Sequence, residues 1–449
     1  MSPRLKQLTD GATPNSFGNP LFLRLWVTTL MSGTAVAAHD TAATWMMNLM
    51  SPSGLFISLM ASVAALPFFL FTLPAGAFAD ALNEGRILRL ANLWLAGSAG
   101  MLALLGWAGK LTPVFLLMGV FLLGAGFAIN APAWASIIPQ IVTDAELPSA
   151  SALNGIQLNI SAILGPALAG ILLTKVGAPV VFALNAAGFL LVSAAVPSVP
   201  KPGLGLGPAL KTFAASVSSA FLYIGRTQSV RNIIIRNAIF SCSIVVVPAL
   251  TPVLLLKELS LDGSSLGLVF ASLGAGSVIG AIFLISWLRS RFSSEALLAS
   301  SQIVLASIYL LIATVHHCIY CLIPMALTGA AWTLAASELW VLAQRAVPNS
   351  LRGRVSAIFM VTSQGVSAVG GLIWGLSGQV IGSRLTLIAA GLFVFSATTG
   401  PLLLGLSKKS LSITGKRRLV LAKSDPANSS NRPVHLNTDN KRISRECNS

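Results

Sequence analysis

Two carboxylates inside long apolar segments are the residues of this chain best suited to chemistry. Asp40 follows His39 in the stretch SGTAVAAHDTAATWMM, and Glu338 lies seven residues before Arg345. A charged side chain at the centre of a bilayer costs about 3 kcal/mol on insertion scales, so it usually faces a cavity or a partner. A buried carboxyl group can also take up and release a proton near neutral pH. Both residues are therefore candidate proton carriers.

Each carboxylate also has a structural interpretation. Asp40 could make a helix-packing hydrogen bond or lie so near the outer interface that it is solvated, whereas Glu338 could pair with a cytoplasmic arginine. His39 points about 100° away from Asp40 on a helix, so the two side chains need not touch. On the carrier interpretation, Asp40 forms a polar face with Thr41 and Thr44 that is directed toward a central cavity.

The composition predicts the elements that hold these residues. Of the 449 residues, 55% are hydrophobic and 9% are charged, whereas about a quarter of the residues in a soluble domain are charged. This balance predicts an all-α polytopic membrane protein. The net charge of +16 does not indicate nucleic-acid binding, because cytoplasmic loops of membrane proteins collect Lys and Arg. Four scattered cysteines are too few for a disulfide framework.

Twelve segments are long and apolar enough to cross the membrane as helices. They fall into two six-helix halves, residues 21–198 and 232–406, which are joined by a predicted cytoplasmic linker at 199–231. Residues 1–20 are predicted as a cytoplasmic N-terminal segment and 407–449 as a basic, disordered cytoplasmic tail. The predicted helices are 22–47, 54–79, 87–108, 113–138, 148–173, 179–198, 232–256, 265–288, 295–315, 319–343, 354–378 and 384–406.

Charge asymmetry predicts the orientation of these helices. Lys110, Lys175, Lys257 and Arg384 lie in the connections that would be external, and the other 25 of the 29 Lys and Arg would be internal. Ten of those 25 lie in the tail, so the rest of the chain still divides 15 to 4. The positive-inside rule then places both termini in the cytoplasm of a multi-pass protein of the bacterial inner membrane.

The two halves resemble each other in sequence. WASIIPQIVTDAELPSASA, which begins at Trp134, aligns with WVLAQRAVPNSLRGRVSAI, which begins at Trp340, at an offset of 206. Duplicated six-helix halves are typical of secondary transporters, whose substrate site lies between the halves near the bilayer midplane. Spaced glycines, which let helices pack closely, recur at an offset of 205: Gly165, Gly170 and Gly177 match Gly370, Gly375 and Gly382.

Polar residues on two helices are candidates for the lining of that cavity. Asn154, Gln157 and Ser161 recur at i, i+3 and i+7 on the predicted fifth helix. Gln364 and Ser367 on the eleventh helix are candidate counterparts across the cavity. Hydrogen bonds between neighbouring helices explain the same pattern equally well.

The segment HHCIYC holds four side chains that can bind metals. Two thiols at i, i+3 together with histidines could hold Zn²⁺ or Cu⁺, which would suit a membrane-embedded metal enzyme or sensor. An interfacial histidine pair beside small buried cysteines also explains the segment, and we predict no metal and no other cofactor. No phosphate-binding G-x-x-x-x-G-K-[ST] loop is present, so the sequence does not indicate ATP hydrolysis. The four residues are His316, His317, Cys318 and Cys321.

The loop PAGAFADALNEGRILR resembles the signature of the major facilitator superfamily between helices two and three, G-x-x-x-D-R-x-G-R-R. The resemblance implies that Asp80 belongs to a cytoplasmic latch that engages the start of helix eleven, where Arg352 and Arg354 stand. The alternative is a solvated turn. Ala81 replaces the usual basic residue, and Glu84 lengthens the loop by one. The matching positions are Gly76, Asp80, Gly85, Arg86 and Arg89.

Helix five is similar to the glycine-rich motif of proton-coupled exporters of this superfamily, which ends in G-P-x-x-G-G. In NGIQLNISAILGPALAG, the residues Gly165, Pro166 and Gly170 fit this motif, while Ala169 replaces a glycine. The predicted fourth helix contains no arginine, unlike that of many drug–proton antiporters. The motif favours export, and the missing arginine argues against those antiporters.

The whole pattern resembles the enterobactin-exporter-like branch, the transmembrane secretion effectors. The resemblance covers about residues 19–406 and includes NPLFLRLW, ATWMM, LPSASALNG and VPNSLRGRVSAI. It implies a monomeric secondary transporter, not an enzyme, that exports a siderophore, drug or metabolite by proton antiport with alternating access. Import or lipid flipping by the same fold is the alternative.

Overall fold

The computed structural model describes residues 18–51, 53–81, 84–143, 146–197, 218–348 and 351–403, and every regular element in these ranges is a helix. This confirms the all-α prediction. The first half contains α2 (Pro20–Met50), α3 (Gly54–Ala81), α4 (Glu84–Trp107), α5 (Pro113–Ile141), α6 (Leu147–Lys175) and α7 (Ala178–Ala195). The second contains α9 (Gln228–Ile244), α10 (Val246–Val253), η2 (Leu254–Glu258), α11 (Gly263–Ile279), η3 (Gly280–Leu284), α12 (Ile285–Arg289), α13 (Ser294–Ala313), α14 (Ile319–Ala346), α15 (Arg352–Ile381) and α16 (Ser383–Leu403).

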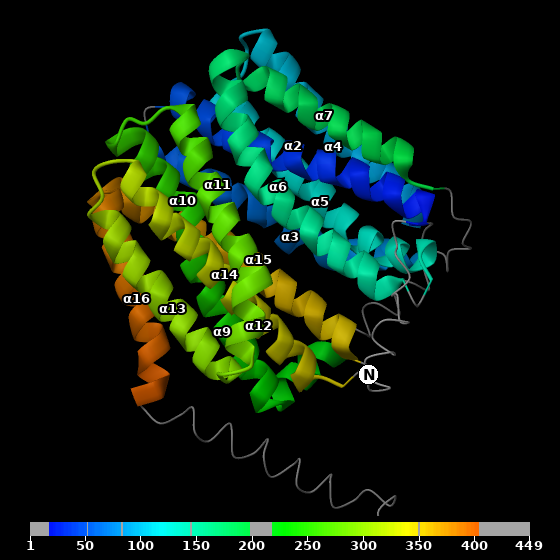
Figure 1. Cartoon of the computed structure of the whole chain (residues 1–449), viewed down its shortest axis with the longest axis vertical. Coiled ribbons are helices and arrows are strands. Elements are labelled where there is room, and N and C mark those ends of the chain that lie inside the picture. The colour runs from blue at the N-terminus through cyan, green and yellow to red at the C-terminus, as the bar shows by residue number, and fades with distance from the viewer. Residues whose placement is uncertain are drawn as a thin grey trace, which may run out of the picture. The chain divides into compact units, whose positions relative to one another are not determined.

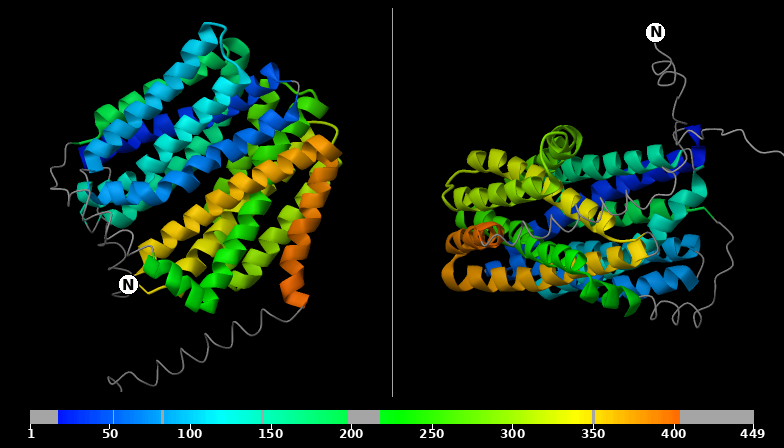
Figure 2. Two further views of the ribbon diagram at one scale, coloured as in Figure 1. Left: turned by 180° about the vertical axis from the view of Figure 1, so that it is seen from behind. Right: turned by 90° about the horizontal axis from the view of Figure 1, so that it is seen from below.

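Eleven continuous helical segments of the described chain are long and apolar enough to cross a membrane. Two of them are composite: α9, α10 and the π-helical η2 form one segment, and α11, the π-helical η3 and α12 form another. The predicted twelfth segment coincides with α16, whose apolar part, Ser383–Thr399, is shorter than the about 20 residues that span the hydrocarbon. Figures 1 and 2 show α2–α7 gathered beside one another and α9–α15 gathered in a second group.

The segments predicted to lie outside the helices fall mostly outside the described residues. This applies to 1–17, to 199–217 of the predicted linker, and to the whole predicted tail, 407–449. The last part of the predicted linker, 218–226, is helical and packs against the second half: Ala220 and Tyr223 join a cluster with Val230 and Val355.

The duplication predicted from the glycines is visible in the packing within each half. Gly165 of α6 lies so close to Ala37 of α2 that a side chain at position 165 would clash. Gly370 of α15 lies against the equivalent residue, Cys242 of α9, with more room: a Cβ there would be 3.4 Å from the thiol sulfur. Gly370 and Cys242 are the residues 205 positions after Gly165 and Ala37, so the two contacts are equivalent in the duplication.

The contacts between the halves repeat as well. A Cβ on Gly170 of α6 would lie 3.2 Å from Ser264 Cα of α11, and one on Gly375 of α15 would lie 2.7 Å from Ser58 Cβ of α3. The Pro166 carbonyl of α6 also lies directly against Gly267 of α11. The pairs α6–α11 and α3–α15 are therefore related by the internal duplication, and glycines bring both pairs close together.

We call the end of the bundle that carries six short connections the hairpin end. The last glycines of the repeat lie there: Gly177 has φ +80° and Gly382 has φ +86°. Each immediately precedes a helix, α7 or α16, so the chain reverses at equivalent points in the two halves. The described residues of these connections are 51 and 53, 108–112, 176–177, 259–262, 314–318 and 382.

Candidate functional site

The Asp40 side chain is exposed on α2. The hydroxyl of Thr44 donates to the backbone carbonyl of Asp40 at 2.8 Å, and the hydroxyl of Thr41 donates to the carbonyl of Ala37 at 3.0 Å. Within the described ranges, the Asp40 carboxylate has no hydrogen bond or ion pair. Both threonine hydroxyls thus donate to carbonyls of their own helix. The predicted alternative, a packing hydrogen bond to the Asp40 carboxylate, has no partner among the described residues.

The neighbours of Asp40 define the face of α2 on which it lies. His39 is 1% exposed and packs against Phe182 of α7, with ring centroids 4.5 Å apart. Ala37 contacts α6 at Gly165. At 100° per residue, Asp40 falls between these two contacts. The carboxylate therefore lies on the arc of α2 between its contacts with α6 and α7, and its predicted orientation toward a central cavity stays a prediction.

The polar face of α6 makes interhelical hydrogen bonds. The amide of Gln157 donates to the carbonyl of Thr29 on α2 at 3.0 Å, and the hydroxyl of Ser161 donates to that of Leu30 at 3.3 Å. Both side chains are buried, whereas Asn154 is half-buried. The packing interpretation therefore describes Gln157 and Ser161 in this structure.

The second half has equivalent bonds, but they use residues that the sequence did not single out. The hydroxyls of Ser241 on α9 and Ser363 on α15 lie 2.7 Å apart, and one turn away Asn237 donates to a backbone carbonyl of α15. The signal was a polar pair at i, i+4 in an apolar helix. The predicted counterparts Gln364 and Ser367 are half-buried.

Glu338 forms an ion pair with an arginine of the second half. The Nε of Arg289, at the end of α12, donates to Oε1 of Glu338 at 2.6 Å. Glu338 is fully buried, while the arginine side chain is 39% exposed. The other carboxylate oxygen, Oε2, has no hydrogen-bond partner among the described residues. The predicted alternative, an ion pair to an arginine, matches this contact.

Close packing of two parallel helical segments creates this pair. A Cβ on Gly280 of η3 would lie 2.9 Å from Ala330 Cα of α14. From that contact both chains run in the same direction for about two turns, to Arg289 on one side and Glu338 on the other. The absence of a side chain at position 280 thus brings the guanidinium within reach of the carboxylate.

The residues of the predicted latch lie at the end of the bundle opposite the hairpin end. Gly76 and Asp80 belong to α3, and the side chain of Asp80 lies outside the described residues. Arg352 and Arg354 are exposed at the start of α15, where Arg354 donates to the Ser219 hydroxyl at 3.3 Å. The latch contact therefore stays a prediction. In α4, the remaining signature residues are buried Gly85, exposed Arg86 and half-buried Arg89.

The HHCIYC segment does not assemble into a ligand set. His316 and His317 are exposed, Cys318 is half-buried and Cys321 is buried at the start of α14. Nowhere in the described chain do three or more His, Cys, Asp or Glu side chains come together as a metal site would require.

A junction at the hairpin end was not anticipated from the sequence. Lys257 of η2 donates to the backbone carbonyls of Asn48 at 3.0 Å and Ser51 at 2.6 Å, at the C-terminus of α2. The Ser58 hydroxyl of α3 donates to the Ala249 carbonyl of α10 at 2.7 Å. These three hydrogen bonds cross between the halves. The positive-inside count placed Lys257 in an external connection, but it could not identify the groups that this lysine contacts.

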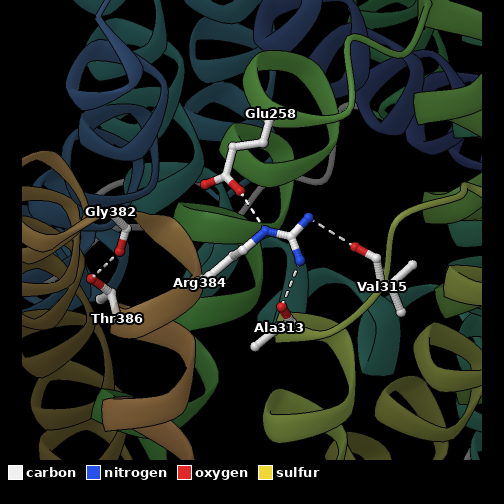
Figure 3. A network of polar contacts seen from close by, with 6 residues as sticks. All are labelled: Glu258, Ala313, Val315, Gly382, Arg384 and Thr386. Atoms are coloured by element: carbon white, nitrogen blue, oxygen red, sulfur yellow. Dashed lines mark hydrogen bonds and ion pairs between the residues drawn. The ribbon is translucent and has the colours of Figure 1, made fainter.

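Glu258, the residue after Lys257, forms an ion pair within the second half (Figure 3). Arg384 donates to the Glu258 carboxylate at 2.9 Å and to the backbone carbonyls of Ala313 and Val315 at 2.7 and 3.0 Å. A cavity of about 280 Å³ borders this junction, between α3, η2 and α15. Its polar lining includes Ser58, Lys257, Glu258 and Gln379.

Comparison with known proteins identifies the family. The model of the transmembrane secretion effectors matches residues 12–412. The enterobactin exporter of Citrobacter koseri is 22% identical over 386 residues, 81% of this chain and 86% of its own. The macrolide efflux protein A of Streptococcus pyogenes is 21% identical over 297 residues, 65% of this chain and 72% of its own.

A solved structure supports the fold. The nucleoside transporter NupG superimposes with a TM-score of 0.67 at 13% identity, covering 86% of this chain and 98% of its own. The helices, the duplicated packing and the matching family model therefore agree: the chain belongs to the transmembrane secretion effectors and is a membrane transporter of the major facilitator superfamily.

Proposed function

We propose that this transporter exports a small organic molecule from the bacterial cytoplasm in exchange for protons. The names of its relatives, an enterobactin exporter and a macrolide efflux protein, support export and indicate siderophores, drugs or related metabolites as substrates. The positive-inside asymmetry supports an orientation in which both termini are cytoplasmic and the hairpin end is external.

The observation that carries the proton proposal is the Glu338–Arg289 pair. Glu338 is fully buried, one of its oxygens pairs with Arg289, and the other has no hydrogen-bond partner among the described residues, so the pair rests on a single contact. Protonation of Glu338 would remove the attraction and release the partly exposed guanidinium to solvent. A proton that binds one conformation more tightly than the other shifts the balance between them, which is how antiport is coupled.

The test is flux driven by a pH gradient in proteoliposomes. Glu338→Gln is expected to abolish proton-driven export of enterobactin or a macrolide while probe binding stays within about twofold. The reason is that glutamine keeps the shape and can still accept a hydrogen bond from Arg289, but it cannot ionise.

Glu295→Gln is the matched control. Glu295 also pairs with an arginine, Arg236, but its side chain is 35% exposed. We expect this variant to retain coupled export. Full coupled flux in Glu338→Gln would refute the assignment of the coupling proton to the buried pair.

A further inference from the structure

Lys257 joins two helix ends that belong to different halves. Its ammonium donates to the carbonyls of Asn48 and Ser51, in the last turn and at the C-cap of α2. No basic residue lies in the last turn of α2 itself. Carbonyls at a helix C-terminus lack intrahelical donors and carry partial negative charge, so a cation placed there is favourable. The C-terminus of α2, in the first half, is thus capped by Lys257 of the second half.

The second half holds Lys257 in place through its neighbour. Lys257 and Glu258 are the last two residues of the π-helical η2. Arg384 donates to the Glu258 carboxylate, to the carbonyl of Ala313 at the end of α13, and to that of Val315 just after it (Figure 3). Short π-helical segments often occur at functional positions, because they rotate side chains out of the α-helical register. Two consecutive residues are therefore directed to different halves of the molecule.

We propose that Lys257 is the latch of the external gate, a role that rests on the proposed alternating-access export. Opening this end separates η2 from α2, so both hydrogen bonds of the ammonium must break. Among the described residues, the contacts between the halves at this end also include a neutral hydrogen bond from Ser58, apolar packing of Val253, and close packing at glycines such as Gly375. Lys257 adds a charged contact between the halves at this junction, and it borders the 280 Å³ cavity. Water entering that cavity can solvate the ammonium as it leaves α2.

The latch can be tested by the exposure of a buried thiol. Ser62 is 8% exposed and lies between α3 and α15 against Gly371, so Ser62→Cys reports separation of the halves. The background is the full chain with its four cysteines replaced by Ala or Ser. In purified protein, without substrate or pH gradient, the rate of labelling by a charged methanethiosulfonate follows the open fraction. Lys257→Met is expected to raise that rate about tenfold or more, because hydrogen bonds to a charged donor are lost.

The controls separate gate opening from general loosening. Ser301→Cys, in α13 and 2% exposed, reports the interior of the second half and is expected to label at an unchanged rate. Lys110→Met removes an exposed lysine at the same end and is expected to have no effect. Lys257→Arg should restore slow labelling, since arginine keeps the charge and the donors.

The outcomes distinguish this proposal from the proposed function. In the Lys257→Met protein, an unchanged labelling rate at Ser62→Cys overturns the proposal that Lys257 holds the external gate closed. An equal rise in the labelling rate at Ser301→Cys overturns it too. Should the methionine variant not fold, Lys257→Gln replaces it, with a smaller rise expected in the same direction. Because the measurement involves neither cargo nor proton flux, a failure of export or of proton coupling would leave its result interpretable.

Discussion

At the scale of single residues, two carboxylates that look alike in the sequence have opposite surroundings. Glu338 is fully buried and paired, while Asp40 is exposed and has no partner among the described residues. The sequence places both carboxylates in apolar segments and predicts an ion pair as one interpretation of Glu338. It could not identify Arg289 as the partner, because that contact depends on the close approach of η3 and α14 at Gly280.

Asp40 is the second candidate on the proton route, in the half of α2 nearer the hairpin end. We expect Asp40→Asn to reduce proton-driven flux while changing the free energy of unfolding by less than about 0.5 kcal/mol, because an exposed carboxylate without a partner contributes little to packing. Flux in proteoliposomes and thermal unfolding in detergent measure the two effects. Coupled flux at the wild-type rate would remove Asp40 from the route and leave Glu338 as the sole candidate of the two.

At the scale of elements, the spaced glycines were the most informative signal in the sequence. Their offset predicted equivalent close contacts, and Gly165 and Gly370 make them against α2 and α9. The π-helical segments η2 and η3 were not predictable, because one extra residue in a turn leaves no mark in an apolar run. Those two segments set the registers of Lys257 and Arg289, so the ion pair and the junction at the hairpin end required the structure.

Gly177 and Gly382 occupy a backbone region that side chains rarely adopt, with φ +80° and ψ 169°, and φ +86° and ψ 154°. We expect Gly177→Ala and Gly382→Ala each to lower the free energy of unfolding by about 1–3 kcal/mol, since strain in this region has that cost. Gly155→Ala is the control: it lies within α6 with open space around it and should be neutral or stabilising. Thermal unfolding in detergent checks all three, and equal midpoints would contradict the strain argument.

At the scale of the whole molecule, orientation is the property on which the export proposal depends most. The 15-to-4 division of Lys and Arg predicts both termini in the cytoplasm, so tags at residues 1 and 449 should be protected in intact cells. A tag inserted in the connection 108–112 at the hairpin end should be accessible from outside. Protease or antibody accessibility measures both. An accessible C-terminal tag in intact cells would reverse or break the assigned topology.

The duplicated contacts also bear on how the molecule is assembled. Separate buried clusters form in the first half, around residues such as Leu88 and Leu95, and a large one forms in the second half, around residues such as Tyr309. The interface between them repeats itself, α6 on α11 and α3 on α15, as it would between two identical chains related by a twofold axis. In these terms the transporter is a tethered dimer, and its ancestor needs to have encoded only one six-helix subunit that recognised its own copy.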